Sequence, residues 1–201
     1  MSLKKVFVFV LICFILFCFF YYIFSKRGNN KNSNREIEID DVLENFLNYE
    51  ANLKINISSN KTNNSYSSIQ KVENQYSKMV VFNPEENFNI EIEVNNNVLK
   101  ITNKLLDVEK IYENQKILLN NHLFLNVFVQ DFKENESKIE ETNEEIIINT
   151  NLKNNPNTYI KYKELVIDKK SLKPKKLIIK DNAQNNKICI IYNDVKFNFY
   201  N

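Results

Sequence analysis

The chain has very little of the residues on which most catalytic sequence motifs depend. Its 201 residues include one glycine, one histidine, three cysteines, three prolines and no tryptophan. Because the only glycine is Gly28, no glycine-rich phosphate loop, dinucleotide fingerprint or GxSxG nucleophile elbow can be present. The single His122 also excludes an HExxH motif and any zinc site with several histidines. We therefore predict a protein that is not an enzyme, with no catalytic, cofactor-binding or metal-binding residues.

Basic and acidic residues are segregated along the chain. Residues 1–35 contain no acidic residue and six basic ones, which are Lys4, Lys5, Lys26, Arg27, Lys31 and Arg35. The other 21 of the 27 basic residues and all 25 acidic residues lie in 36–201, which carries a net charge of −4. A mildly acidic body has no electrostatic footprint for nucleic acid, so we predict no nucleic-acid partner.

Residues 6–24 form an unbroken apolar run of 19 residues. As a helix this run spans about 28 Å, close to the roughly 30 Å hydrocarbon core of a bilayer. The alternative is a cleaved secretory signal, which needs an apolar stretch of about 7–15 residues and a small-residue cleavage site. The run is longer than that and has no such site, so we predict a cytoplasmic tail over 1–5 and a single-pass membrane anchor over 6–24.

The flanking charges do not decide the orientation of this anchor. Lys4 and Lys5 lie before it, and four basic residues follow it within 25–35. Counting positive charges slightly favours a cytoplasmic body, whereas the short N-terminal tail favours a body outside the cell. Both orientations stay open on charge alone.

The cysteines do not predict lipidation or a disulfide. Cys13 and Cys18 follow Ile12 and Phe17, whereas a bacterial lipoprotein acylation site needs a small residue at that position. We interpret both as apolar membrane residues. Cys189 is then alone outside the anchor, so no disulfide can form within the body.

A tether and a short helix follow the anchor. Residues 25–35 contain no large apolar side chain, and we predict a flexible tether over 25–38 that leads into a folded domain over 39–201. A helix is predicted over 41–49, because Val42, Leu43, Phe46 and Leu47 share one face. Asp41 and Glu44 have the spacing of a capping box.

Beyond this helix the apolar period changes to two, which predicts β-strands. The predicted strands are 53–57, 66–72, 76–82, 88–94, 98–103, 145–150, 159–168, 176–180 and 187–199. Asparagine makes up nearly a fifth of the chain and clusters between these strands. Because asparagine tolerates positive φ best after glycine, we predict that it forms the hairpin turns of an antiparallel meander.

Residues 115–132 interrupt the meander with a segment that is apolar around most of a helix circumference. Such a helix must be covered on several sides, and the concave face of a curved sheet would cover it. A buried strand pair is the alternative.

His122 lies inside this segment, and we interpret it as a packed, hydrogen-bonded side chain rather than a catalytic one. We interpret the adjacent acidic residues as solvated, at Glu85–Glu86, Glu140–Glu141 and Glu144–Glu145. The tyrosines are typical of a half-buried sheet face, at Tyr49, Tyr66, Tyr76, Tyr159, Tyr162 and Tyr192.

The order of these elements, and several short segments, resemble a known superfamily. The segments are YEANLKI (49–55) followed by Ser58, Asn60 and Lys61, then Tyr66, Gln70, MVVFNPE (79–85), 165–168, 172–177, 181–182 and 191–198. Over about 40–199 the chain resembles the LolA-like half-barrel superfamily, and within it the clostridial germination lipoproteins of the GerS kind.

The resemblance implies an α+β fold, in which a curved antiparallel sheet forms an open half-barrel and helices cover its concave face. It also implies an extracytoplasmic body and a protein partner, a spore-cortex amidase. A lipid ligand and a homodimer are further expectations, with a tethered lipid or lipoprotein carrier as the alternative function. The chain departs from the germination lipoproteins at the anchor, where the acylation motif is missing and a membrane helix would do the tethering.

Overall fold

The computed structural model describes residues 38–59, 61–74, 76–83, 88–95, 98–113, 122–153, 155 and 160–197. Residues Glu38–Asn201 form one compact unit. The predicted tail, the anchor over 6–24 and nearly all of the predicted tether lie outside the described residues. Among the residues that are described, no helix is both long and apolar enough to cross a bilayer.

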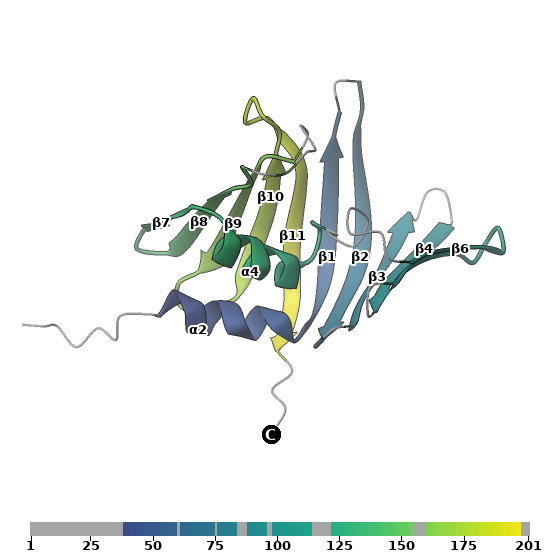
Figure 1. The fold of residues 1–201 in the computed structure, drawn as a ribbon, viewed down its shortest axis with the longest axis horizontal. Helices are drawn as coiled ribbons and strands as arrows, with labels where there is room; N and C mark the ends of the chain where they lie inside the picture. Colours follow the sequence, from purple (N-terminus) through teal and green to yellow (C-terminus); the bar gives the residue numbers. More distant parts are fainter. Residues whose placement is uncertain are drawn as a thin grey trace, which may run out of the picture. The chain divides into compact units, whose positions relative to one another are not determined.

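One antiparallel sheet dominates this unit (Figure 1). Its strands are β1 (Tyr49–Ser58), β2 (Asn63–Glu73), β3 (Tyr76–Asn83), β4 (Phe88–Asn95), β5 (Val98–Asn103), β6 (Val108–Glu113), β7 (Ser137–Glu141), β8 (Glu145–Asn151), β9 (Tyr162–Asp168), β10 (Pro174–Lys180) and β11 (Asn186–Phe197). In space they follow the order β6-β5-β4-β3-β2-β1-β11-β10-β9-β8-β7. The sheet is therefore two meanders, joined where the first strand pairs with the last.

This topology explains why a helical segment interrupts the meander. Strands β6 and β7 are consecutive among the strands, yet they lie at opposite edges of the sheet. The chain between them must return from one edge to the other, and helix α4 (Leu125–Glu134) belongs to this return. Helices α2 (Ile39–Glu44) and α4 lie on the same face of the sheet (Figure 1).

Every predicted strand is confirmed, with ends that shift by a few residues. Two strands, β6 and β7, were not predicted, because they lie at the edges of the sheet and their apolar and polar residues hardly alternate. Their side chains are exposed at nearly every position, in VEKIYE of β6 and SKIEE of β7. A strand whose faces are not covered by other elements needs no row of apolar side chains at alternate positions. Its sequence therefore shows little of the alternation that predicts a strand.

The short N-terminal helix is confirmed over a narrower range than 41–49. It runs as α2 over Ile39–Glu44 and continues as a 3-10 turn, η1 (Asn45–Leu47). Tyr49 belongs to β1 and not to the helix. The predicted capping box is wrong, because the N-cap is Glu38 and no side chain caps the helix.

The predicted helix over 115–132 is confirmed from Leu125 onward. Residues 114–121 lie outside the described residues, and 122–124 form a turn rather than a helix. The helix begins at Leu125, since Phe124 has an extended backbone with ψ of 146°. The alternative of a strand pair is wrong for the described part of this segment.

The described turns contain no glycine, as predicted, and several of them place a residue other than asparagine at positive φ. Among the described residues, positive φ occurs at Asn74, Asp107, Leu172, Gln184 and Asp194. Only Asn74 is an asparagine. Asparagine instead acts through its side chain, as where Asn48 Oδ1 accepts a hydrogen bond of 2.9 Å from the backbone N–H of Asn74.

The core lies between the helices and the sheet face that they cover. The inward positions of β1 are Tyr49, Ala51, Leu53 and Ile55, and all four are buried. The register continues this face through Tyr192 and Ile190 of β11. On the helical side, Phe46 of η1 and Phe128 of α4 are fully buried. The side of the sheet that carries these residues is called the inner face below, and the opposite side the outer face.

Candidate functional site

Helix α4 is fixed to the inner face by a set of buried hydrogen bonds. The N-cap residue, Phe124, makes no capping hydrogen bond with its side chain. Instead, the backbone N–H of Leu125 donates to Tyr49 Oη at 3.2 Å, and this hydroxyl donates to Gln70 Oε1 at 2.7 Å. Gln70 Nε2 in turn donates to the carbonyl oxygen of Leu123 at 3.0 Å. The sheet therefore satisfies the polar groups that the start of a helix leaves open.

A second polar contact holds the opposite end of the same helix. The Nζ of Lys163, on β9, lies 2.5 Å from Asp131 Oδ2 on α4. Lys163 is fully buried. Burial lowers the pKa of its ammonium group, while the charge of Asp131 opposes that effect. Burial alone would raise the pKa of Asp131, but His122 and Lys163 outweigh it and keep that pKa below its ordinary value.

His122 lies beside this ion pair, at the turn before α4. Its Nδ1 is 3.9 Å from Asp131 Oδ2, which is within ion-pair range but too long for a direct hydrogen bond. Its Nε2 is 3.3 Å from Asn155 Nδ2. The prediction of a packed histidine is confirmed, whereas Nδ1 has no hydrogen-bond partner among the described residues.

Two further buried hydroxyls on the inner face have no hydrogen-bond partner within the described part of the chain, Ser68 Oγ and Tyr192 Oη. The register places Leu53 of β1 between them, opposite Ser68 on one side and Tyr192 on the other. Burial raises the pKa of Tyr192 far above its ordinary range, and the nearby Tyr49 adds to this effect. Unpaired hydroxyls in an apolar interior are unusual, because such a group normally finds a partner.

The other sequence candidates do not assemble into a catalytic arrangement. Cys189 pairs with Asn56 and Ile178 in the register, whereas the next residue, Ile190, is on the inner face. Cys189 therefore lies on the outer face, across the sheet from His122. Burial raises the pKa of its thiol, which disfavours the reactive thiolate.

The acidic candidates are exposed or ion-paired. Glu140 and Glu141 lie on edge strand β7, where they pair with Lys138 at 2.7 Å and with Lys169 at 2.9 Å. Glu145 pairs with Lys175. The pair Glu85–Glu86 lies outside the described residues. The described residues contain no group of three or more His, Cys, Asp and Glu side chains that could hold a metal ion.

The tyrosines divide into two groups that the sequence did not separate. Tyr66, Tyr76 and Tyr162 are half-buried, as the sheet pattern predicts. Tyr49 and Tyr192 are instead fully or nearly fully buried, with exposed fractions of 0% and 6%. Tyr159 lies outside the described residues.

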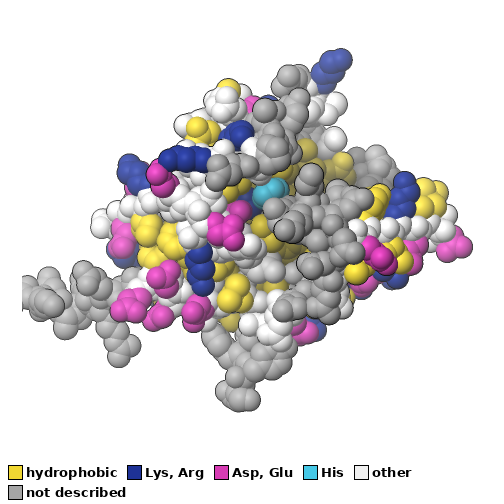
Figure 2. Space-filling model, viewed as in Figure 1, with side chains coloured by type: hydrophobic (Ala, Val, Ile, Leu, Met, Phe, Trp, Pro, Cys, Tyr) yellow, Lys and Arg dark blue, Asp and Glu magenta, His cyan; other side chains and the backbone are white. Residues whose placement is uncertain are grey.

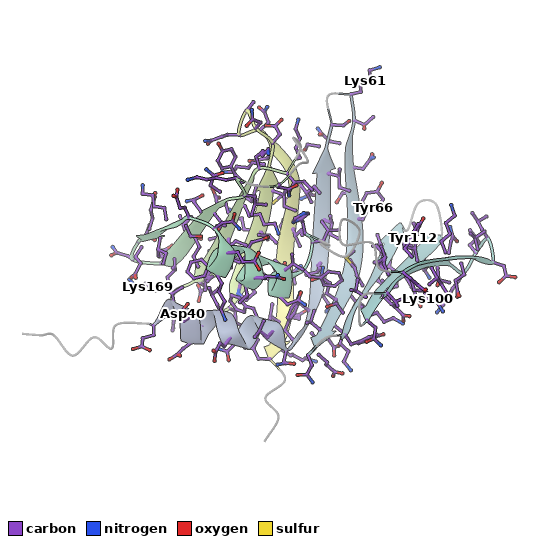
Figure 3. The ribbon with its side chains drawn as sticks, in the orientation of Figure 1. Asp40, Lys61, Tyr66, Lys100, Tyr112 and Lys169 are labelled. Carbon is purple, nitrogen blue, oxygen red and sulfur yellow. The ribbon has the colours of Figure 1, made fainter. Side chains whose placement is uncertain are left out.

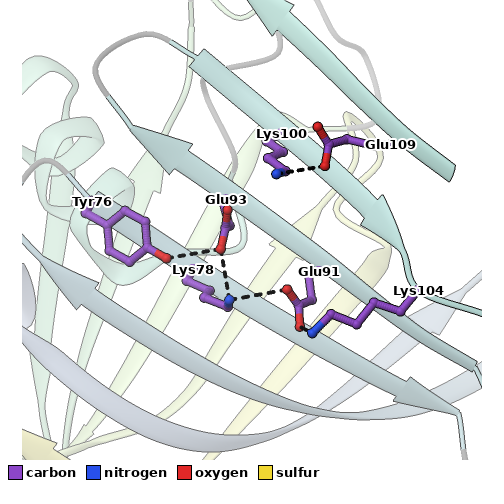
Figure 4. Close-up of polar contacts among 7 residues, drawn as sticks. All are labelled: Tyr76, Lys78, Glu91, Glu93, Lys100, Lys104 and Glu109. Atoms are coloured by element: carbon purple, nitrogen blue, oxygen red, sulfur yellow. Dashed lines mark hydrogen bonds and ion pairs between the residues drawn. The ribbon is translucent and has the colours of Figure 1, made fainter. Parts of the chain in front are cut away.

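The outer face of β3–β6 carries a ladder of ion pairs (Figure 4). Lys78 Nζ lies 2.8 Å from Glu93 and 3.3 Å from Glu91, and Glu91 also pairs with Lys104 at 2.5 Å. Tyr76 Oη donates to Glu93 at 3.2 Å. Hydrogen bonds from Lys104 and Lys78 hold the pKa of Glu91 below its ordinary value, and the hydrogen bond from Lys78 does the same for Glu93. Lys100 and Glu109, at 2.7 Å, extend the ladder to β6.

Figure 3 relates this ladder to the ends of the sheet. Lys100 and Tyr112 lie near the β5–β6 edge, and Lys61 lies at the end of the long β1–β2 hairpin. The β5–β6 hairpin is unusual because its connection is apolar. Leu105 and Leu106 are 62% and 66% exposed, and Val108, the first residue of β6, is 45% exposed. Figure 2 shows apolar side chains at the surface over this end of the sheet, beside basic and acidic ones.

Comparisons with known proteins identify the fold but no sequence family. No known protein family and no curated protein matches the sequence. Among solved structures, a chain in the structure of the CwlD amidase from Clostridioides difficile in complex with the GerS lipoprotein matches at 18% identity. This match covers 85% of this chain and 99% of that chain, with a TM-score of 0.52.

Two other solved structures also match this chain. An uncharacterized conserved protein from Thermus thermophilus matches at 9% identity over 81% of this chain and 86% of its own, with a TM-score of 0.52. A LolA superfamily protein from Nitrosomonas europaea matches at 11% identity over 80% and 94%, with a TM-score of 0.44.

The chain therefore shares the fold of these neighbours, a large, open antiparallel sheet with few helices, which is consistent with the half-barrel that the sequence predicts. Its structural neighbours include GerS, so the resemblance to the GerS kind of protein predicted from the sequence is confirmed at the level of the fold.

Proposed function

We propose that this chain is a membrane-tethered, extracytoplasmic binding protein that binds and supports a spore-cortex amidase and is not itself an enzyme. The observation that carries this proposal is the match to the structure of the CwlD amidase with GerS, which extends over 99% of the matched chain. A match over nearly the whole length of that chain supports the proposal, because the two chains then share one architecture.

The interior of the domain supports a binding role. Helix α4 occupies the inner face, with Leu125, Phe128 and Val129 buried against it. A carrier of acyl chains needs this space to be open, whereas an adaptor needs only a rigid scaffold. The hydrogen bonds of Tyr49 and Gln70, together with the Asp131–Lys163 pair, provide such rigidity.

The test is binding and activity with the amidase. A tagged fragment of residues 36–201 is incubated with CwlD, and complex formation and peptidoglycan cleavage are measured with and without the fragment. We expect a stable complex and a higher rate of cleavage. No complex and an unchanged rate would reject the proposal. The matched control is the same fragment with α4 loosened by Asp131→Leu, which should bind less well if the scaffold must be rigid.

A second candidate, a tethered lipid-binding module, is favoured by one observation. On the inner face of β4 and β5, the apolar side chains of Ile90, Ile92, Val94 and Ile101 are only half-buried. The unpaired hydroxyls of Ser68 and Tyr192 lie on the same face of the sheet. Native mass spectrometry of the purified chain tests this candidate: a co-purified lipid supports it, and a bare chain that displaces no acyl probe rejects it.

A further inference from the structure

We propose that the β5–β6 hairpin is a second membrane contact, which inserts Leu105 and Leu106 into the bilayer to which the N-terminal segment tethers the domain. This proposal rests on the tethering part of the proposed function, but not on the amidase.

The first argument is exposure. Among the described residues, Leu105 and Leu106 are the most exposed of the large apolar side chains. Val108 follows them at 45%, and Ile111 of the same edge strand is 54% exposed. Val108 is on the inner face of the sheet and Ile111 on the outer face, so the leucines at the tip have exposed apolar side chains on both faces behind them. Exposed apolar side chains gathered in this way at one hairpin mark an interaction site rather than ordinary surface.

The second argument is that the turn is built to hold these leucines outward. Asn103 Oδ1 accepts hydrogen bonds from the backbone N–H groups of Leu105 and Leu106, at 3.1 and 3.2 Å. Asp107 closes the turn with φ of 50°. The last pair of the β5–β6 register is Asn103 with Val108, so the leucines lie beyond the paired residues of the two strands. Because the turn is already ordered, little conformational entropy is lost when it binds.

The position of the leucines argues for a lipid surface rather than a second copy of the chain. Pairing of two β6 edges would cover the strand and leave the connection beyond it uncovered. A symmetric pairing centred on Ile111 would also place Glu109 of each copy opposite Glu113 of the other, and like charges directly opposite are unfavourable. A projecting apolar tip needs no complementary groove in a fluid bilayer.

The charges around the hairpin are compatible with a headgroup layer. Lys100, Lys104 and Lys110 alternate with Asp107, Glu109 and Glu113, so the hairpin over 98–113 carries no net charge. Lys104 has a 64% exposed side chain next to the leucines, where its stem can lie along the interface. The balance predicts that acyl-chain insertion, rather than attraction to anionic lipid, dominates the contact.

The length of chain before the described residues brings the hairpin within reach of the bilayer. The predicted anchor ends at residue 24 and the description begins at Glu38. The residues from 25 to 38 span at most about 50 Å when fully extended and about 20 Å on average as a flexible linker. A domain of this size has a radius of gyration of about 15 Å, so a tether of this length is long enough for a surface feature of the domain to meet the bilayer.

The absence of tryptophan gives a clean test in the full chain. Leu106→Trp creates a protein whose only tryptophan reports on the hairpin, and excitation above the range of the ten tyrosines isolates its emission. The full chain is reconstituted into vesicles of phosphatidylcholine and phosphatidylglycerol, either plain or brominated in the acyl chains. We expect blue-shifted emission and loss of about half of its intensity in brominated vesicles.

The matched control is Ile139→Trp on edge strand β7, where the native side chain is 41% exposed. We expect its emission to be the same in plain and brominated vesicles. Adding Leu105→Asp to Leu106→Trp should abolish most of the quenching. If brominated lipid does not quench the emission of the Leu106→Trp chain, the proposal is overturned. This holds also where an aqueous quencher fails to reach the tryptophan, because another copy of the protein then covers the hairpin.

The tether is scored separately by flotation of the reconstituted chain and its resistance to extraction at high pH. A chain that resists extraction but shows no quenching keeps the proposed tether and overturns the hairpin contact. A chain that is released from the vesicles contradicts the tether and, with it, the hairpin contact.

Discussion

The strands β4 and β8 carry the same kind of alternating sequence but bury their apolar side chains to different extents. In β8, Ile146 and Ile148 are fully buried on the inner face. In β4, Ile92 and Val94 occupy equivalent phases and remain half-buried. A period of two therefore predicts which side chains share a face, whereas burial depends on what packs over that face.

The difference extends to whole regions of the sheet. We call β1–β3 with β8–β11 the covered sheet, because its inner face carries most of the core and the contacts to α4. We call β4–β6 the wing, where Leu99 is the one fully buried apolar residue among those described. The covered sheet relies on packing, and the wing adds ion pairs on its outer face (Figure 4). Ion pairs at a surface contribute far less than buried apolar side chains, so the wing should be the less stable region.

The largest difference is expected for apolar truncations in the two regions. Phe128→Ala removes a fully buried ring from α4 and should lower the free energy of unfolding by about 3–5 kcal/mol. Ile101→Ala, at a half-buried position of the wing, should cost about 1–2 kcal/mol. Urea unfolding of the 36–201 fragment, followed by circular dichroism, measures both. Equal costs would show that the wing is packed as tightly as the covered sheet.

The next prediction concerns the buried ion pair of the covered sheet. Asp131→Leu leaves the ammonium group of Lys163 buried without its partner, and should cost about 3–5 kcal/mol. Adding Lys163→Met removes the stranded charge, so the double variant should regain most of this loss. The same unfolding measurement applies. A double variant as unstable as Asp131→Leu alone would mean that the pair contributes specific stabilisation beyond avoiding an unpaired charge.

These buried contacts are the part of the molecule that sequence reasoning could not supply. Tyr49, Gln70 and Lys163 meet α4 across separations of 76, 53 and 32 residues, and no local pattern connects them. One signal was present, however. In β9, Lys163 stands in phase with the buried Leu165 and Ile167, and a lysine at an inward position of a strand requires an acidic partner.

The strands of the fold could be predicted from the sequence, because the alternation in segments such as 88–94 and 145–150 is a local property. The way the two meanders join could not be predicted, since the pairing of β1 with β11 brings together the two ends of the domain. The candidate binding surface was also missed. Leu105 and Leu106 were not singled out, although two leucines beside Asn103 and Asp107 in a turn are an exception to the polar composition of hairpin connections.

The third prediction compares two tyrosine hydroxyls. Tyr49→Phe removes the group that accepts from Leu125 and donates to Gln70, and leaves both buried partners unsatisfied. We expect a loss of about 1–3 kcal/mol. Tyr76→Phe removes a half-exposed hydroxyl that donates to Glu93, and should cost less than about 1 kcal/mol. Hydrogen exchange of the amides at the start of α4 provides the local readout, which should quicken for Tyr49→Phe only.

The smallest effect is expected in the ion-pair ladder, and its pH dependence identifies it. The folded state holds the pKa of Glu91 below its ordinary value of 4.5, because Lys104 and Lys78 donate to the carboxylate. A carboxyl group with a lowered pKa binds its proton more weakly in the folded state, so its contribution is complete above pH 4.5 and is lost as the pH falls through the folded pKa.

Glu91→Gln should therefore reduce the free energy of unfolding by about 0.2–1 kcal/mol at pH 7, and by nearly nothing once the wild-type carboxyl is protonated. The exposed Glu113 of β6 provides the matched control, Glu113→Gln, for which we expect no change at pH 7. Urea unfolding at pH 7 and at pH 3, at low and high salt, separates the two. A difference between wild type and Glu91→Gln that is as large at pH 3 as at pH 7 would show that Glu91 stabilises the wing through packing of its stem rather than through its charge. The ladder would then resemble the covered sheet more than a charged surface.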